Sequence, residues 1–540
     1  MLRQKGFIMA VILLISAVFV LQAQEFPVNE KQFLGDNNSR LKDLYQPGNG
    51  FHTSIRPFLH DEVSKIFNGD SLDKSLHFTS PFSSRFYSWV WNKAFNEDLA
   101  SLNTELLSLR INPLIGFEMG KENGSDEIRW LNARGVRMEG RLGQNIGFAT
   151  TFIENQSNPF TYERMRIQQI GVMPGEGGIK GFKETNYDYA WSSGYVSYNP
   201  TSYLNFQFGQ GKHFIGDGYR SLLLSDEAFN YPYFQFTVNV WKLKYMSMVA
   251  QFTDPSSPSI ADLGYPKKYG TFHYLSIFAG KRLNIGLFES IIWKAADSSN
   301  YRGLELAYLN PVIFLRPVEF SVGSPDNALM GLNISYRFSA SYMMYGQLML
   351  DEMKFKEVMN GNGWWGNKQA VQIGFRYFDL AGLKGLNLLS EFNYARPYMY
   401  SHRSNLQNYG HYNEALAHPL GANFRESISI LSYQHKRFFC DLKMQYAEFG
   451  ADSAGINYGG NIFKPYDDHP FDYGNTTTQG DLNKLYRAEV RLMYLINPAM
   501  NLNAVVGYIY RNQESDQVNR KDNIIYFGLR TSIFNRYKDF

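Results

Sequence analysis

The chain has 540 residues, with 53 Lys and Arg against 50 Asp and Glu and a formal net charge of +3. This near balance offers no basic surface for nucleic acid, and the single cysteine, Cys440, excludes an intrachain disulfide framework. The 42 Phe, 37 Tyr and 8 Trp are the unusual feature of the composition. Tyr and Trp join an apolar ring to a polar group, which suits a membrane–water boundary.

Residues 1–23 are typical of a secretory signal peptide. Arg3 and Lys5 give a positive start, residues 7–21 are apolar, and a cleavage site ends at Ala23. The apolar run is shorter than the roughly 20 residues of a spanning helix, and no other window resembles one. We therefore predict an exported chain that begins at Gln24 and has no helical membrane anchor.

Residues 24–103 follow the leader and lack a strand pattern. Within them, 61–67 and 85–99 have the spacing of helices. We expect a small helical or irregular periplasmic segment. The pattern leaves open whether this segment lies at the rim of the following domain or inside it.

Residues 104–540 alternate apolar and polar side chains in segments of about ten residues, as transmembrane β-strands do. Short turns at 143–145, 200–202, 281–283 and 339–341 alternate with long polar loops such as 397–424. Short turns on one rim and long loops on the other are typical of an outer-membrane barrel. We predict an all-β, antiparallel transmembrane barrel in the cell outer membrane.

The strand count depends on one doubtful hairpin, residues 304–320. It contains Pro311 and Pro317, and proline removes a donor from a strand ladder. Leaving this hairpin out gives about 18 strands, and including it gives 20. The last strand is amphipathic and is followed by a terminal Phe540, an ending that resembles the assembly signal of outer-membrane barrels.

The stretch GQGKHFIGDGYRSLLLSD, residues 209–226, has no phosphate-loop spacing. Its glycines allow the backbone to bend inward, so we expect Asp217 and Arg220 to pair inside the barrel while 222–224 fill apolar space. Two interpretations stay open. Either the loop folds into the barrel and is held there by the Asp217–Arg220 pair, or it forms a polar site at the mouth that contacts sugar or a partner.

Two outer loops, 398–413 and 464–475, combine Tyr rings with acids and amides, which suit pyranose faces and hydroxyl groups. The spacing of an EF-hand is missing, so we predict no metal site. The ligand-binding residues predicted for the mouth and outer loops are Asp217, Arg220, Tyr398, Tyr400, Tyr409, Asp467, Asp468 and Asp472.

A serine-hydrolase barrel is the main enzymatic alternative. It would pair His213, His402 or His418 with Ser221 or Ser401. No nucleophile-elbow spacing supports it. We therefore predict no catalytic residues and no cofactor.

Several sequence motifs occur in a fixed order that is similar to the order in a known protein family. They are FGQGKHFIGDGYRSLLLSDEAFNYPYF, YLNPVIFLRP, DNALMGLNISYRF, QLMLDE, LAHPLGANF and FGLRTSIFNRY. From residue 106 to 540 the chain resembles the Wzi capsule-assembly superfamily, most closely its RemB-like gliding-motility branch. The resemblance implies an eighteen-stranded outer-membrane barrel with a helical part on the periplasmic side. It implies a non-enzymatic protein that binds or anchors surface polysaccharide or supports gliding.

The expected partners are outer-membrane lipid, surface polysaccharide or lipopolysaccharide, and proteins of a gliding or secretion apparatus, but no nucleic acid. The alternative function is a porin-like channel for small solutes or polysaccharide. An open bore would favour the channel, and a bore filled by 24–103 or 209–226 would count against it.

Overall fold

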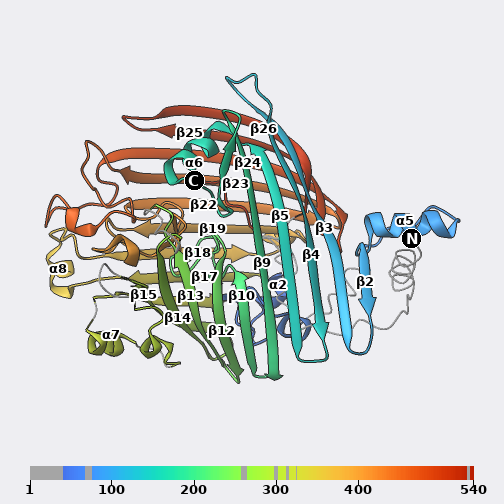
Figure 1. Ribbon diagram of the computed structural model, residues 1–540, viewed down its shortest axis with the longest axis horizontal. Helices are drawn as coiled ribbons and strands as arrows, with labels where there is room; N and C mark the ends of the chain where they lie inside the picture. The colour runs from blue at the N-terminus through green and yellow to red at the C-terminus, as the bar shows by residue number, and fades with distance from the viewer. Residues whose placement is uncertain are drawn as a thin grey trace.

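The computed structural model describes residues 41–66, 76–256, 264–296, 302–311, 315–323, 325–531 and 535–540. The predicted signal peptide lies outside these residues. An antiparallel barrel of 18 strands dominates the described chain and confirms the predicted fold class (Figure 1). The strands are β3 (Leu107–Glu122), β4 (Arg129–Leu142), β5 (Ile146–Asn158), β9 (Asn186–Thr201), β10 (Leu204–Gly211), β12 (Tyr231–Val240), β13 (Leu243–Thr253), β14 (Lys267–Ala279), β15 (Leu283–Lys294), β16 (Asn327–Arg337), β17 (Tyr342–Leu350), β18 (Gln369–Tyr377), β19 (Leu386–Ala395), β22 (Phe424–His435), β23 (Phe438–Ala451), β24 (Asp481–Asn497), β25 (Leu502–Glu514) and β26 (Asn519–Thr531).

The barrel closes where β26 pairs with β3, in a register that runs from Ile524 opposite Glu122 to Arg530 opposite Gly116. The periplasmic part of β3 continues beyond this pairing. There a short strand, β2 (Ala100–Asn103), pairs with it, and Ala100 faces Ile111. Closure pairs the backbone groups that an open edge would leave free, as a strand wall in lipid requires.

Short turns join the strands at the periplasmic rim, and long loops join them at the extracellular rim, as predicted. The described residues of 304–320, which are 304–311 and 315–320, contain no barrel strand. They include η1 (Leu306–Leu309), and α7 (Arg316–Val322) begins within them, so the count of 18 holds. The other extracellular loops carry α6 (Thr161–Ile170), β6 (Val172–Met173), β7 (Gly177–Gly178), β8 (Lys180–Phe182), β11 (Phe214–Ile215), α8 (Phe355–Asn360), η3 (Asn405–Gln407), β20 (Gly410–His411), β21 (Glu414–Ala415) and η4 (Tyr466–Asp468), and η2 (Leu380–Gly382) lies in a periplasmic turn.

The two faces of the wall differ as a membrane requires. On β26, Ile525 and Phe527 are 59% and 56% exposed on the outer face, whereas Tyr526 between them is 7% exposed and points inward. The inward positions of β18 and β19 include buried Gln372 and Glu391. An apolar exterior around a polar interior places this barrel in the outer membrane.

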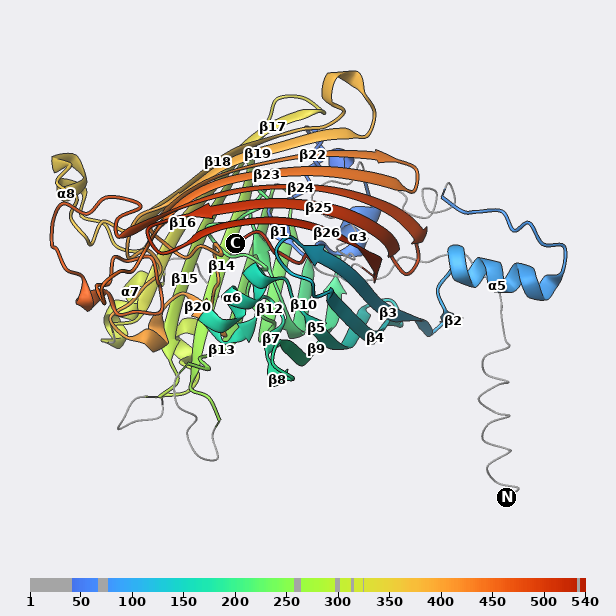
Figure 2. The same ribbon diagram turned by 90° about the horizontal axis from the view of Figure 1, so that it is seen from above.

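The bore is occupied by several segments of the same chain. Residues 41–66, with α2 (Leu41–Leu44), β1 (Ile55–Arg56) and α3 (His60–Ser64), pack inside, and β1 pairs with β11 of the loop 212–230. The tail 535–540 also turns inward, and in Figures 1 and 2 the C-terminus lies within the outline of the wall. The N-terminal segment therefore lies in two places. Residues 41–66 are inside the bore, whereas α5 (Arg85–Phe95) lies at the periplasmic rim.

Among the described residues, no helix combines the length and the apolar character needed to cross a bilayer.

Candidate functional site

The loop 212–230 folds into the bore because two glycines allow its backbone to approach the wall. At Gly216, φ is +150°, and a Cβ there would lie 2.4 Å from Nε2 of Gln347. At Gly218, a Cβ would lie 2.7 Å from Oε2 of Glu391. The positive φ at Gly216 favours glycine, and a Cβ at Gly218 would also lie 2.8 Å from the Arg220 carbonyl oxygen, so the inward bend depends on glycine.

Asp217 and Arg220 both lie inside the barrel, as predicted, but the predicted pair between them is wrong. Asp217 accepts hydrogen bonds from Thr53 Oγ1 at 2.6 Å and from Asn333 Nδ2 at 3.1 Å. Asp217 therefore ties the loop to the N-terminal segment. Arg220 takes its carboxylate partners elsewhere because the loop between the two residues turns their side chains toward different parts of the wall.

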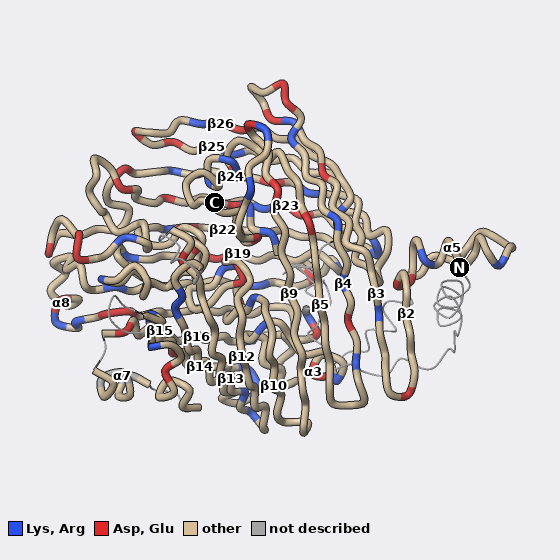
Figure 3. Tube along the Cα trace, in the orientation of Figure 1, with Lys and Arg blue, Asp and Glu red and all other residues tan. Residues whose placement is uncertain are grey.

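Arg220 is the centre of a buried charge network, and its side chain is 2% exposed. It pairs with Glu426 of β22 at 3.3 Å and with Asp539 of the tail at 3.0 Å. Asp539 also pairs with Lys443 at 2.8 Å and accepts from Tyr219 Oη at 2.6 Å. Figure 3 shows Lys and Arg interleaved with Asp and Glu along this part of the wall, β22 to β26. We call Arg220, Glu426, Asp539 and Lys443 the tail clasp.

The tail clasp holds the last residues of the chain inside the barrel. Phe540 does not follow the lipid face of β26. Its ring lies 6.0 Å from that of Tyr162 in α6, and Arg166 lies over it at 5.8 Å. The sequence reasoning missed Asp539, although an acidic residue directly before the terminal aromatic was a visible signal.

The other side of the bore is apolar. Leu222, Leu223 and Leu224 are fully buried against Met and aromatic side chains of β12 to β17, as predicted. Tyr400 and Tyr409 stack on each other with centroids 5.7 Å apart, and their hydroxyls donate to the carbonyl oxygens of Leu222 and Leu223. Both rings are fully buried. Both rings, like Asp217 and Arg220, are buried in contacts that hold the loop, and the ligand-binding role of these four residues stays a prediction.

Two long loops, 351–368 and 452–480, meet at the extracellular end. Trp365 stacks on His469 with ring centroids 4.3 Å apart and lies 5.1 Å from the ring of Tyr466. The Trp365 amide donates to the Asp472 carbonyl oxygen at 3.0 Å, so backbone hydrogen bonding joins the loops. We call the following side chains the mouth cluster: Trp364, Trp365, Tyr466, Asp467, Asp468, His469, Phe471, Asp472 and Tyr473.

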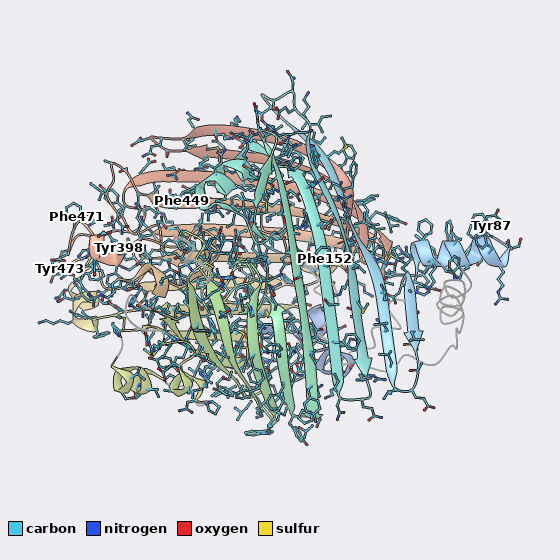
Figure 4. All side chains as sticks on the ribbon, in the orientation of Figure 1. Tyr87, Phe152, Tyr398, Phe449, Phe471 and Tyr473 are labelled. Atoms are coloured by element: carbon cyan, nitrogen blue, oxygen red, sulfur yellow. The ribbon has the colours of Figure 1, made fainter. Side chains whose placement is uncertain are left out.

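The mouth cluster is accessible. Phe471 and Tyr473 are 58% and 53% exposed and project at the extracellular end, beside the buried Tyr398 (Figure 4). The predicted acids Asp467, Asp468 and Asp472 are all exposed around these rings. The predicted Tyr398 is 1% exposed and forms the floor of the cluster, where its hydroxyl donates to the Asn457 carbonyl oxygen at 3.0 Å. The two tryptophans were missed, although GNGWWGN in a polar loop was a usable signal.

A cavity lies beside the tail near the extracellular ends of β3 to β5. Its lining includes Trp130, Tyr189 and Phe540 together with several charged residues. Lys538 pairs there with Glu163, and Arg536 pairs with Glu176, each at 3.0 Å. The charged groups of these two pairs therefore already have partners within the chain.

The hydrolase alternative finds no support in the geometry. Ser221 Oγ donates to the Ile215 carbonyl oxygen and Ser401 Oγ to that of Tyr398, each at 2.6 Å. Burial lowers the pKa of each histidine considered as its base, namely His213, His402 and His418. Within the described ranges, no three His, Cys, Asp or Glu side chains are grouped as metal ligands would be.

No known family model and no curated protein matches this sequence. Among solved structures, the chain is similar to Wzi of Escherichia coli, described as a carbohydrate-binding outer-membrane β-barrel involved in group 1 capsule assembly. Identity is 13%, the match covers 95% of this chain and 100% of that one, and the TM-score is 0.54. OprD and OpdK of Pseudomonas aeruginosa each match with 9% identity and a TM-score of 0.42, over 78% of this chain and 94% and 97% of theirs.

At this identity the likeness to Wzi shows a shared barrel fold. It agrees with the fold that the resemblance to the Wzi superfamily implied. The closer resemblance to the RemB-like gliding branch stays a prediction.

Proposed function

We propose that this protein is a non-enzymatic outer-membrane barrel that binds or anchors polysaccharide at the cell surface through the mouth cluster. The observation that carries the proposal is the joined surface of exposed rings and carboxylates above a filled bore. Aromatic faces pack against the apolar faces of sugar rings, and carboxylates accept hydrogen bonds from sugar hydroxyls.

The architecture supports binding at the mouth more than passage through the barrel. Residues 41–66, the loop 212–230 and the tail 535–540 lie inside the wall, which counts against a porin-like channel. Wzi, which shares the fold, is itself described as binding carbohydrate. Service to a gliding or secretion apparatus is a second role that the same surface would permit.

The test is binding of the purified, folded barrel to surface polysaccharide or lipopolysaccharide from its own cell. Replacing Phe471 and Tyr473 together by alanine removes two exposed rings, each worth about 0.5–1.5 kcal/mol, so affinity should fall roughly five- to a hundredfold. The double variant Asp467→Asn and Asp468→Asn should also weaken binding. Asp126→Asn, an exposed acid of the β3–β4 loop, is the matched control.

Unchanged binding by both mouth variants would place any glycan site elsewhere, and no binding by the native barrel would reject the proposal. Ion conductance by the native barrel in a planar bilayer would favour the channel instead. Co-purifying surface proteins without glycan binding would favour the apparatus role.

A further inference from the structure

The helix α5 carries an apolar stripe with large exposed side chains. Phe86, Tyr87, Trp89 and Val90 are 64%, 58%, 56% and 42% exposed. Positions 86, 89 and 90 lie at i, i+3 and i+4, so their side chains share one face of the helix. Exposed large apolar side chains gathered on one face mark a surface that is buried in use.

The opposite side of α5 already has a partner. Trp91 and Phe95 lie 4.4 Å apart by ring centroid and are only partly exposed. Asn497, the last residue of β24, donates through Nδ2 to the carbonyl oxygens of Lys93 and Glu97 at 3.0 and 3.1 Å. The C-terminal end of the helix is therefore fixed to the periplasmic rim.

Arg437, in the β22–β23 turn, strengthens this attachment. Its guanidinium donates to the carbonyl oxygens of Leu76 at 2.7 Å and Phe95 at 2.9 Å, and it lies 3.8 Å from the ring centroid of Phe78. A helix attached by its C-terminal end leaves its N-terminal half to project. Figures 1 and 2 both show α5 reaching outward beyond the barrel wall, and Figure 4 places Tyr87 on the projecting part.

Exposed aromatic side chains also occur on the barrel wall near the place where α5 is attached. Phe438 and Tyr494 face each other on β23 and β24 beside the turns that hold α5, and they are 40% and 42% exposed. Trp241, in another periplasmic turn, is 82% exposed. Exposed aromatic side chains at a barrel rim form the girdle that lies at the membrane–water interface.

We propose that α5 lies in the periplasmic interface of the outer membrane, with Phe86, Trp89 and Val90 inserted among phospholipid chains. The helix has 11 residues, far fewer than a spanning helix needs, but enough for an interfacial one. Its two charged residues are basic: Lys93 pairs with Glu97 at 3.1 Å, and the exposed Arg85 at the projecting end suits anionic headgroups. The helix thereby acts as a lateral anchor, independently of any glycan bound on the opposite side of the membrane.

The test uses a single thiol in the full chain. In a Cys440→Ser background, Val90→Cys carries an environment-sensitive fluorophore, and the barrel is reconstituted in vesicles of phosphatidylethanolamine and phosphatidylglycerol. Glu97→Cys, exposed just beyond α5, is the matched control. Brominated-chain phospholipids should quench the label at position 90 several-fold more than at position 97, whereas aqueous iodide should show the reverse order.

Equal iodide quenching at both positions would overturn the proposal, because the stripe would then face water. Crosslinking from position 90 to a second copy or to a periplasmic protein, without lipid quenching, would also overturn it. The double variant Phe86→Ser and Trp89→Ser should abolish lipid quenching at position 90. Heat-modifiable gel mobility should stay unchanged in this variant, because the wall strands do not depend on the stripe.

Discussion

Replacing Asp539 by asparagine should open the tail clasp. The carboxylate is fully buried and lies 3.0 Å from Arg220 and 2.8 Å from Lys443. Removing one partner of a buried ion pair costs about 3–5 kcal/mol. The low end applies here, because asparagine keeps one acceptor oxygen and Glu426 still faces Arg220 at 3.3 Å. We therefore expect a loss of about 3 kcal/mol, equivalent to roughly a hundredfold larger open population.

Hydrogen exchange of the folded barrel measures this directly. Amides in 212–230 and 535–540 should exchange about a hundredfold faster in the variant, because local opening sets their protection. Amides of the wall strands should keep their rates. Asp126→Asn, in which the lost carboxylate is exposed, should change neither set. Wild-type protection of the tail in Asp539→Asn would refute the assignment of the clasp.

The same clasp has a defined pH dependence. Burial by itself raises the pKa of Asp539, but Arg220 and Lys443 outweigh it and hold that pKa well below its ordinary value. A lowered folded-state pKa stabilises the fold above the unfolded pKa of about 4, and this stability is lost as pH falls through the folded pKa. Tail protection should therefore stay constant from about pH 8 to about pH 5 and disappear only in stronger acid.

Three further changes test other contacts inside the bore. Burial raises the pKa of Glu414 to about 7, so the fold around this carboxyl should lose stability as pH rises from about 4.5 to about 7, and the Gly175 amide that donates to it should exchange faster; Glu414→Gln should remove this dependence. Gly218→Ala should destabilise the loop by about 1–3 kcal/mol through overpacking, lowering the temperature of the gel-mobility transition, whereas Gly181→Ala, with open space around it, should not. Arg337→Met removes the donor to the Phe51 carbonyl oxygen at 2.7 Å and leaves that acceptor unpaired. Limited proteolysis should then cut within 41–66 faster than in the native barrel, and unchanged cleavage would contradict this role.

The sequence by itself determined the barrel wall. Lipid contact requires an apolar side chain at every second position of a strand. This alternation can be recognised within the sequence of a single strand, such as β26 or β10, without knowledge of its neighbours. Turn length is equally local, so the periplasmic and extracellular rims could be assigned before the structure was known. The prolines at 311 and 317 decided the doubtful hairpin for the same reason, since each affects the backbone where it stands.

Only the tertiary structure decided what fills the bore and what is left at the mouth. Arg220 contacts Asp539 across 319 residues, and nothing local distinguishes that carboxylate from the nearer Asp217. Tyr409 and Tyr473 both lie on long polar loops, yet the first is fully buried and the second is 53% exposed. Whether a loop side chain meets solvent depends on where the whole loop folds, and that is set by packing against distant strands.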